Sequence, residues 1–477
     1  MTLDAAVLQR VYAQIDADLD QHIERLRELV RQPSISGEDY GIRECAELVA
    51  RFLREAGCDL VEIFPTAGHP VVYGELNTGA PRTLLIYMMY DVQPVAGEHW
   101  RVEPFAGDLV REGSFPQVLM ARGATNSKGP LAAFINAVES IQAVGTCPVN
   151  LIFLAEGEEE LGSPSLPGFI RQNQERLARA DAMYFPMPRQ EIDGRALLWP
   201  GTKGMLYFTL EVSGKSMGRG PQEFDIHSSQ KAIVDNPAWR LVQALSTMAS
   251  ADGNTPTIDG ALDRVRCPNA SEKRVFDAVA GRIDVDAFRR VWRVPRFIDT
   301  ASERELLRRY FFDATLNIDG ISTGYTGAGT KTVLPHKATA KLDMRLVPEQ
   351  DPHEVAACIR AHLDRRGFHD VQLTVDSANP HSQADPESAI VQAAARAARA
   401  FGVEPEVWPR NVGFFPAYLF SGHPLHLDYC VGGLGHGARA HGPDEYFVLK
   451  GDGFVKGLDE IEKCHALTLF EFAKPSP

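Results

Sequence analysis

Helix-like and strand-like segments alternate along the first 200 residues of the chain. Apolar residues recur at helical spacing over about 4–31, 39–56 and 129–144. Between these helices stand the short apolar runs "HPVVYGEL", "TLLIYMMY" and "VNLIFLAEG", which are typical of buried strands. This alternation predicts an α/β fold, a mixed sheet flanked by helices. In such sheets ligands bind where strand ends run into loops.

A second pattern begins near residue 205. The strand-like stretch "LLWPGTKGMLYFTLEVSG" leads into the helix-like "NPAWRLVQALSTM", and after a polar, arginine-rich region another strand and helix follow. The order β-α-β-β-α-β, with insertions, predicts a smaller α+β domain inserted at 205–380. Residues 1–204 and 381–477 would then form one α/β domain, to which the tail adds loops and a helix.

Composition favours a small ligand. The net charge of −14 opposes nonspecific contact with nucleic acid or an anionic membrane. No apolar run approaches the roughly 20 residues that span a bilayer. Seven cysteines without CxxC spacing fit a reducing compartment, and the N-terminal stretch lacks the features of a signal peptide. We expect a cytoplasmic protein whose partner is a small molecule, with no nucleic acid and no membrane.

Four loops carry more polar residues than a structural loop needs. They are "MMYDVQP" (88–94), "ARGATNSKGP" (121–130), "AEGEEELGSP" (155–164) and "AHGPDE" (440–445). A run such as Glu158–Glu160 is usually a solvated face, but this one directly follows a buried-looking strand. Neighbouring carboxylates at a strand end raise one another's pKa unless they share a cation or a proton. The run therefore suits metal binding or acid–base chemistry.

The four loops, of which the last contains "HGPDE", are accompanied by the motifs "PSISG", "GTKG", "NPAWRLVQAL" and "GYTGAGTKTVLP". These segments resemble the motifs of a two-zinc peptidase family and occur in the same order. The family includes carnosine dipeptidases, aminoacylases, succinyl-diaminopimelate desuccinylase and carboxypeptidase G. The resemblance spans nearly the whole chain, and the dipeptidase-like branch is nearest. It implies a catalytic domain that holds two zinc ions, with an inserted lid domain that mediates homodimerisation. The implied substrate is a small peptide-like or acyl-amino-acid molecule.

The resemblance also implies roles for single residues. Glu159 matches the general base, and its neighbour Glu160 matches a zinc ligand. Asp91 matches the aspartate that orients a ligand histidine. His441 matches the distal zinc ligand.

The expected substrate contacts lie in other motifs. His227 matches a lid histidine that polarises the scissile carbonyl in the partner's active site, although the residue alone fits an ordinary histidine equally well. Arg345 matches an arginine that holds a substrate carboxylate. Phe414 stands where the family often has a small hydroxyl that contacts substrate, so the pocket should be more apolar.

Three of the five zinc-ligand positions implied by the resemblance carry poor ligands. Met89 stands at a histidine position, Asn126 at the bridging aspartate and, by a looser alignment, Met187 at another aspartate. Zinc prefers thiolate, imidazole and carboxylate over thioether or neutral amide. Only Glu160 and His441 remain as residual candidates. We therefore expect no metal centre and no other cofactor, or at most one weakly bound zinc.

Three functional hypotheses stay open without a zinc-bound hydroxide. The first is metal-independent acid–base chemistry by Glu159, Asp91 and His227, through amide formation, cyclisation, acyl transfer or isomerisation. In this case His441 would pair with Glu160 and serve the substrate side together with Arg345 and Phe414. The second is a residual one-metal peptidase or amidohydrolase. The third is a non-catalytic binding or regulatory homologue.

Overall fold

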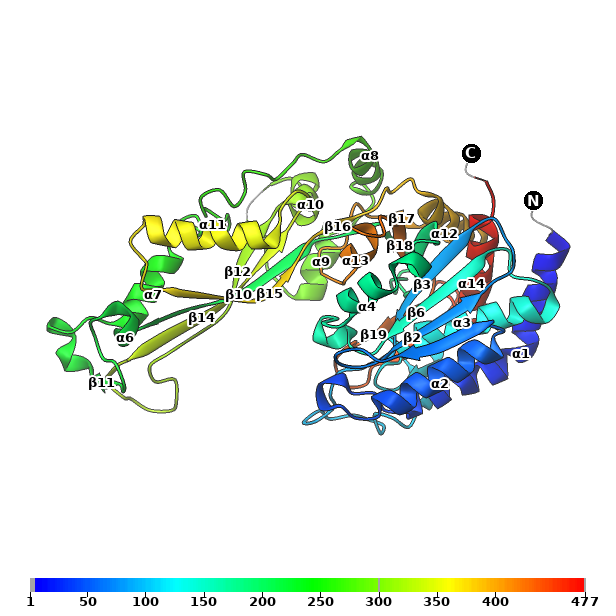
Figure 1. Cartoon of the computed structure of the whole chain (residues 1–477), viewed down its shortest axis with the longest axis horizontal. Helices are drawn as coiled ribbons and strands as arrows, with labels where there is room; N and C mark the ends of the chain where they lie inside the picture. Colours follow the sequence, from blue (N-terminus) through cyan, green and yellow to red (C-terminus); the bar gives the residue numbers. More distant parts are fainter. Residues whose placement is uncertain (1–4, 299–300, 476–477) are drawn as a thin grey trace. The chain divides into compact units, whose positions relative to one another are not determined.

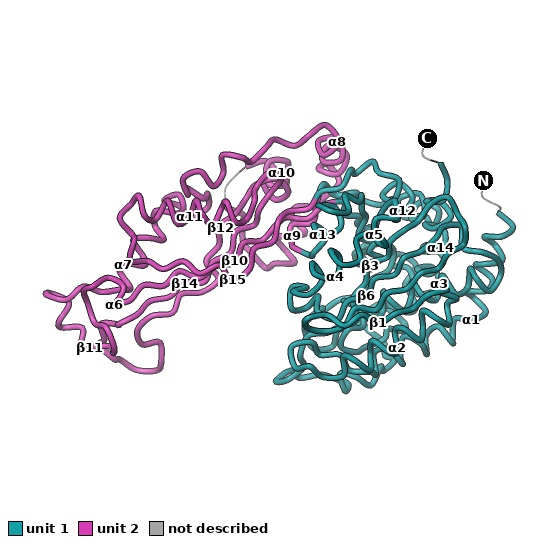
Figure 2. Tube along the Cα trace, viewed as in Figure 1, with its two compact units in different colours: residues 1–200, 383–409, 415–477 teal, residues 201–382, 410–414 magenta. Residues whose placement is uncertain are grey.

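The structure is a computed structural model and describes residues 5–298 and 301–475. The chain divides into two compact units (Figure 2). Unit 2 comprises residues 201–382 and 410–414, and unit 1 comprises the remainder. The segment 410–414 thus belongs to unit 2, whereas the sequence analysis placed it in the first domain. The catalytic role of unit 1 and the lid and dimerisation role of unit 2 stay predictions.

Unit 1 is built on an eight-stranded mixed sheet in the order β1-β2-β6-β3-β7-β18-β8-β17 (Figure 1). The four strands β6, β3, β7 and β18 run parallel, and the flanking pairs β2–β6 and β18–β8 are antiparallel. The strands are Leu60–Phe64 (β1), Val71–Leu76 (β2), Thr83–Met89 (β3), Asn150–Glu156 (β6), Ala182–Phe185 (β7), Leu197–Trp199 (β8), Glu406–Val407 (β17) and Asp428–Gly432 (β18).

Among the described residues, five helices contribute to one large hydrophobic cluster of unit 1. They are Ala5–Arg31 (α1), Ile42–Glu55 (α2), Lys128–Val144 (α3), Ala389–Ala400 (α12) and Leu458–Phe472 (α14). In α2 the buried residues Ile42, Cys45, Ala46 and Val49 recur at helical spacing and form one apolar face. The mixed sheet flanked by helices confirms the expected fold class. Across the described ranges, no helix combines the length and the apolar character that a membrane crossing requires.

The C-terminal segment contributes strands that the sequence analysis missed. It was expected to add loops and a helix, but β18 lies in the interior of the sheet between β7 and β8. A run as short as "DYCVG" gives no clear periodicity, so only its tertiary partners reveal it as a strand. A second, four-stranded sheet of unit 1 has the order β19-β20-β5-β4, with bounds Gly437–Ala438, Tyr446–Lys450, Phe115–Met120 and Asp108–Glu112.

Unit 2 contains an antiparallel four-stranded sheet in the order β12-β14-β10-β15. Its strands are Gly204–Ser213 (β10), Thr315–Thr323 (β12), Lys337–Leu346 (β14) and Gln372–Asn379 (β15). Alternate β10 residues from Leu206 to Val212 are buried together with residues of helices Pro237–Leu245 (α7) and Pro352–Arg365 (α11). The chain order confirms the predicted β-α-β-β-α-β pattern. The arginine-rich region adds helices Ala270–Val279 (α8), Val285–Trp292 (α9) and Glu303–Phe312 (α10).

Candidate active site

Polar loops meet at one edge of the large sheet of unit 1. Strand β3 ends at Met89, two residues before Asp91, and the neighbouring parallel strand β6 ends at Glu156. The register pairs Met89 with Glu156, so the two strands finish side by side. The loops that carry Asp91 and Glu159 therefore start from the same carboxyl edge, where ligands bind in sheets of this kind.

Asp91 is fully buried and organises the turn that follows β6. Its carboxylate accepts hydrogen bonds from the backbone N–H of Glu159 at 3.2 Å and of Glu160 at 3.1 Å. Burial, and then the charge of Glu160, raise the pKa of Asp91 to about 7. Asp91 thus orients the two glutamates through their backbone.

Glu159 is partly exposed, and in the described part of the chain no hydrogen bond reaches its carboxyl oxygens. Burial, followed by repulsion from Glu160, Asp91 and Glu156, raises the pKa of Glu159 well above the usual value for glutamate. Glu159 therefore keeps a proton at a pH at which an ordinary glutamate is ionised. Its position and its protonation suit a proton donor to a bound substrate.

Glu160, His441, Asn126 and Gln93 form a connected polar group. Glu160 Oε2 lies 3.1 Å from His441 Nε2 and 2.9 Å from Gln93 Nε2. Burial acts to raise the pKa of Glu160, but hydrogen bonds from His441, Gln93 and Asn126 outweigh it and lower that pKa. The same hydrogen bond to Glu160 raises the pKa of His441. The pairing of His441 with Glu160 that the sequence predicted is present as an ion pair.

The amide of Asn126 takes its orientation from these neighbours. Asn126 Nδ2 lies 2.7 Å from Glu160 Oε1 and 3.0 Å from His441 Nε2. The opposite orientation would bring the amide oxygen against an ionised carboxylate, so the NH2 group must face Glu160. A protonated His441 Nε2 donates to Glu160, so its 3.0 Å approach to Asn126 Nδ2 is a contact between two donors and not a hydrogen bond. Asn126 thus presents N–H donors at the centre of the group.

Met89 and Met187 add apolar surface at the same edge. Their side chains are 3% and 2% exposed. Strands β3 and β7 pair as far as Ile86 and Tyr184, and Met89 and Met187 each stand three residues beyond these, Met187 in the loop after β7. No three histidine, cysteine, aspartate or glutamate side chains in the described ranges are grouped so that they could hold a metal ion.

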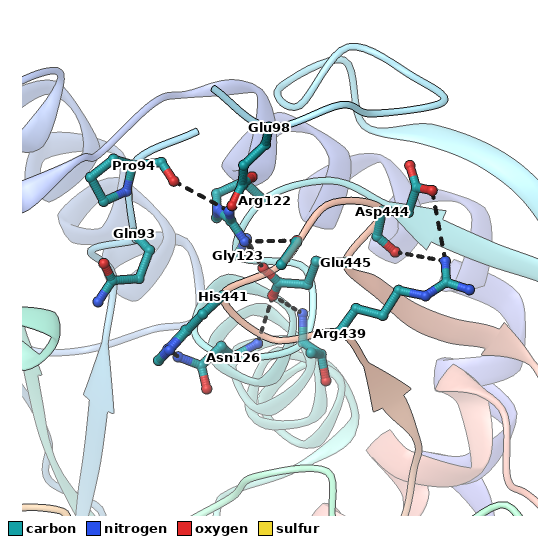
Figure 3. A network of polar contacts seen from close by, with 12 residues as sticks. Gln93, Pro94, Glu98, Arg122, Gly123, Asn126, Arg439, His441, Asp444 and Glu445 are labelled. Carbon is teal, nitrogen blue, oxygen red and sulfur yellow. Dashed lines mark hydrogen bonds and ion pairs between the residues drawn. The ribbon is translucent and has the colours of Figure 1, made fainter. Parts of the chain in front are cut away.

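Glu445 connects the two loops that carry Asn126 and His441 (Figure 3). Its carboxylate lies 3.2 Å from Arg122 Nη1, and both side chains are 1% exposed. Each of three backbone N–H groups donates to Glu445 at 3.0 Å, those of Gly123, Thr125 and Asn126. A buried carboxylate with this many donors holds both loops in one arrangement.

The loop around His441 has a strained backbone. Arg439, His441 and Asp444 have φ values of 61°, 64° and 58°, in the left-handed region that non-glycine residues rarely adopt. Asp444 accepts hydrogen bonds from Arg101 N at 2.7 Å and Arg101 Nε at 2.9 Å. Such contacts keep the loop in a conformation that would otherwise be costly, as is common near functional sites.

Three residues of the site, Gln93, Glu156 and Glu445, had no role predicted from the sequence. Tyr87 Oη and Ser163 Oγ donate to Glu156, whose burial raises its pKa to about 8. An acid at the end of the apolar run "LIFLAE" was a signal that could have identified Glu156. Gln93 and Glu445 stand in quoted motifs, but only the tertiary structure shows which groups they contact.

His227 belongs to unit 2, and its ring is held in one tautomer. The backbone N–H of Ser229 donates to Nδ1 at 3.1 Å, so the proton of the neutral ring is on Nε2. Nε2 lies 3.1 Å from Thr332 Oγ1. An exposed Nε2–H group is a suitable hydrogen-bond donor to a carbonyl oxygen.

Arg345 and Phe414 also belong to unit 2. Arg345 Nε donates to Asp343 Oδ2 at 3.1 Å. Phe414 is partly exposed and lies three residues after Asn411, which pairs with Thr202. The structure therefore brings Asp91, Glu159, Glu160, Asn126 and His441 together within unit 1, while His227, Arg345 and Phe414 are features of unit 2.

Comparison with known proteins identifies the family. The family model described as "Peptidase family M20/M25/M40" matches residues 85–464. The Cys-Gly metallodipeptidase dug1 of Schizosaccharomyces pombe is 28% identical, over 98% of this chain and 99% of the relative. A crystal structure of an M20 family metallo-carboxypeptidase from Sulfolobus solfataricus has a TM-score of 0.83 and 32% identity, covering 94% of this chain and 99% of that one. Human carnosine dipeptidase 1 has a TM-score of 0.76 and 26% identity, covering 98% and 99%. These matches confirm the resemblance seen in the sequence, and the chain belongs to peptidase family M20/M25/M40.

Proposed function

We propose that the protein acts on the amide bond of a small peptide-like or acyl-amino-acid substrate, by acid–base catalysis that needs no two-zinc centre. The dipeptidase and carboxypeptidase names of the relatives support the substrate class. One observation supports the proposal that catalysis needs no two-zinc centre. At position 126, the family resemblance implies a carboxylate that bridges two zinc ions. The Asn126 amide instead directs N–H donors at Glu160.

The residues present do not fit a pair of zinc ions. A metal needs lone pairs directed at it, but Asn126 offers Glu160 the N–H side of its amide. Met89 and Met187 supply only thioethers, which zinc does not favour. Glu160 and His441 are the two suitable donors, so at most one weakly bound zinc is expected.

Glu159 performs the proton transfer in this proposal. The nucleophile, water or an amine, bonds to the carbonyl carbon and forms a tetrahedral adduct. The protonated carboxyl of Glu159 donates its proton to the leaving nitrogen as the carbon–nitrogen bond breaks, and the carboxylate so formed takes the proton that the nucleophile carried. The products are the new acyl compound and the free amine, and Glu159 ends protonated as it began. A positioned acid–base group of this kind contributes about 10²- to 10⁴-fold to the rate.

Other residues position the reacting groups. Asp91 holds Glu159 through the backbone, and the ion pair of Glu160 with His441 sets the local charge. In unit 2, the Nε2–H of His227 would polarise the substrate carbonyl from a partner subunit, and Arg345 would bind a substrate carboxylate. Phe414 would make the acyl side of the pocket apolar.

We propose that the protein is a homodimer formed through unit 2. Strand β12 is at the edge of its sheet and exposes Ile318 (45%) and Ile321 (50%), while helix α7 exposes Trp239 (61%) and Val242 (46%). Edge strands and exposed apolar groups are typical of interfaces. Light scattering should give the mass of two chains, and a monomer at all concentrations would contradict the proposal. All seven cysteines are free thiols, which supports the proposed cytoplasmic location.

The closeness of Glu160 and His441 favours one second candidate, a one-metal peptidase. Metal analysis of protein purified without chelator separates the two, together with assays of dipeptides and acyl-amino acids with and without EDTA. We expect well under one zinc per chain and turnover that EDTA does not change. Stoichiometric zinc with EDTA-sensitive hydrolysis would establish the one-metal peptidase instead.

A further inference from the structure

Unit 2 contains a cavity that no residue of the proposed amide chemistry lines, within the described ranges. Its volume is about 720 Å³, and helices α9 and α10 supply much of its lining together with the segment that follows α7. The lining residues lie between positions 252 and 315, so the cavity is formed within unit 2. Pockets for small organic ligands typically measure about 300–1,000 Å³. The cavity therefore has the size of a small-molecule site.

Three aromatic side chains line this cavity as a group. The rings of Phe288 and Trp292, one helical turn apart on α9, are stacked with their centroids 4.9 Å apart and their planes at 21°. The ring of Tyr310 on α10 lies 5.4 Å from that of Phe288 and 6.1 Å from that of Trp292, centroid to centroid. Trp292 is 48% exposed. Rings in this arrangement offer flat apolar surface to a planar ligand.

Two arginines of the lining are neutralised by nearby acids. Arg308 Nη1 lies 2.7 Å from Asp313 Oδ1, and Arg308 Nε lies 2.8 Å from Glu305 Oε2. Arg309 Nε donates to the other oxygen of Glu305 at 3.2 Å. These ion pairs occupy the α10 arginines, which leaves them little capacity for a ligand.

Arg296 is the lining cation with free donors. It is exposed, and in the described part of the chain its guanidinium has no hydrogen-bond or ion-pair partner. Asp252 also lines the cavity, but its carboxylate accepts hydrogen bonds from its own turn, from Asn254 N at 3.2 Å and Asn254 Nδ2 at 3.0 Å. A guanidinium presents its N–H groups as a fork that matches a carboxylate. The charge that this cavity can still complement is therefore a single anionic group.

We infer that the α9–α10 cavity of unit 2 binds a small amphipathic carboxylic acid. The planar apolar body of the ligand packs against Phe288, Trp292 and Tyr310, and its carboxylate pairs with Arg296. The rings supply most of the affinity through buried apolar surface, and the arginine supplies the selectivity for an acid. The inference goes beyond the proposed function, because none of these residues takes part in the amide chemistry.

The test compares two ligands that differ in one group. 2-Naphthoate and 2-naphthamide have nearly the same shape, but only the first is charged. Calorimetric titration of the full-length protein should show naphthoate binding about two- to fivefold tighter than naphthamide, the range expected for one exposed ion pair. No binding of naphthoate at millimolar concentration, or equal affinity for the two compounds, would overturn the inference.

Variants locate the contact. Arg296→Gln should give naphthoate the affinity of naphthamide, and Phe288→Ala should weaken the binding of both compounds by about tenfold because it removes part of the aromatic surface. Arg293→Gln is the matched control, since Arg293 is an exposed arginine of the same segment outside the lining, and it should bind as the parent does. An Arg296→Gln protein that is folded by circular dichroism and keeps the full preference for the acid would place naphthoate elsewhere and overturn the inference.

These titrations measure binding without turnover. A protein that binds naphthoate through Arg296 but turns over no amide would support this site and contradict the proposed function. A protein that turns over amides but binds no naphthoate would do the reverse.

Discussion

The two units contain charged clusters of opposite sign, each at strand ends. In unit 1 the carboxyl groups of Asp91, Glu156 and Glu159 crowd together, and burial is the first cause of the raised pKa of each. In unit 2 Lys203 lies near Arg410 and Arg345, and burial with repulsion lowers its pKa. Both clusters therefore move toward neutrality, the acids by keeping protons and the lysine by losing one.

The difference between the clusters lies in how they are completed. Glu160 of unit 1 is satisfied internally by His441, Asn126 and Gln93. Lys203 has one backbone carbonyl. This contrast indicates a self-contained acid–base group in unit 1 and a buried lysine with one neutral acceptor in unit 2. Substitutions in each cluster should therefore have different effects.

The largest expected effect is on catalysis in unit 1. Glu159→Gln removes the proton donor and should reduce kcat/KM by about 10²- to 10⁴-fold with the fold unchanged. Steady-state kinetics on a substrate found in the panel measures this. Glu175→Gln, at an exposed position of the same unit, is the control. Full activity of the Glu159 variant would remove this residue from the mechanism.

The next largest effect is on stability. Glu445→Gln places an NH2 group among donors from Arg122 and the backbone, leaving buried donors without an acceptor. We expect the free energy of unfolding to fall by about 3–5 kcal/mol, the range for breaking a buried ion pair. Urea denaturation measures it. An unchanged midpoint would show that Glu445 does not hold the two loops.

A smaller effect is expected at the centre of the acid cluster. Asn126→Asp replaces an amide donor by a carboxylate facing Glu160, which should cost about 1–3 kcal/mol of stability in the presence of EDTA. Added zinc should recover part of this loss, because the new carboxylate supplies lone pairs. Thermal unfolding with EDTA or zinc measures both. A variant as stable as the parent in EDTA would contradict the assigned orientation of the Asn126 amide.

The smallest effects, taken per pH unit, distinguish the clusters by the pH dependence of stability. The raised pKa of Glu156 means that the folded state binds more protons than the unfolded one, so its contribution weakens as pH rises from 4.5 to about 8. The lowered pKa of Lys203 has the opposite sign, so its contribution strengthens as pH rises from about 7 to 10.5.

Variants test these two slopes separately. Glu156→Gln should flatten the stability profile in the lower range and Lys203→Met in the upper range, each by at most about 1.4 kcal/mol per pH unit. Denaturation at a series of pH values measures this. Slopes that remain as in the parent would contradict the corresponding pKa shift.

Much of the site could be predicted from the sequence because its residues stand in ordered motifs. The pairing of His441 with Glu160 was predicted, as was a raised pKa for Glu159. The role of Asp91 as a backbone acceptor was not, because it depends on the turn after β6. Strand β18 was missed because its short apolar run resembles many loops until its neighbours are known.

The sequence by itself determined which chemical groups the protein can use. Periodicity gave the buried strands and helices, and residue identity showed thioethers and an amide where zinc ligands are expected. Only the tertiary structure decided which groups meet. Asn126 contacts Glu160 34 residues away and His441 315 residues away. The physical reason is that hydrogen bonding and desolvation depend on distances in space, which local sequence patterns do not contain.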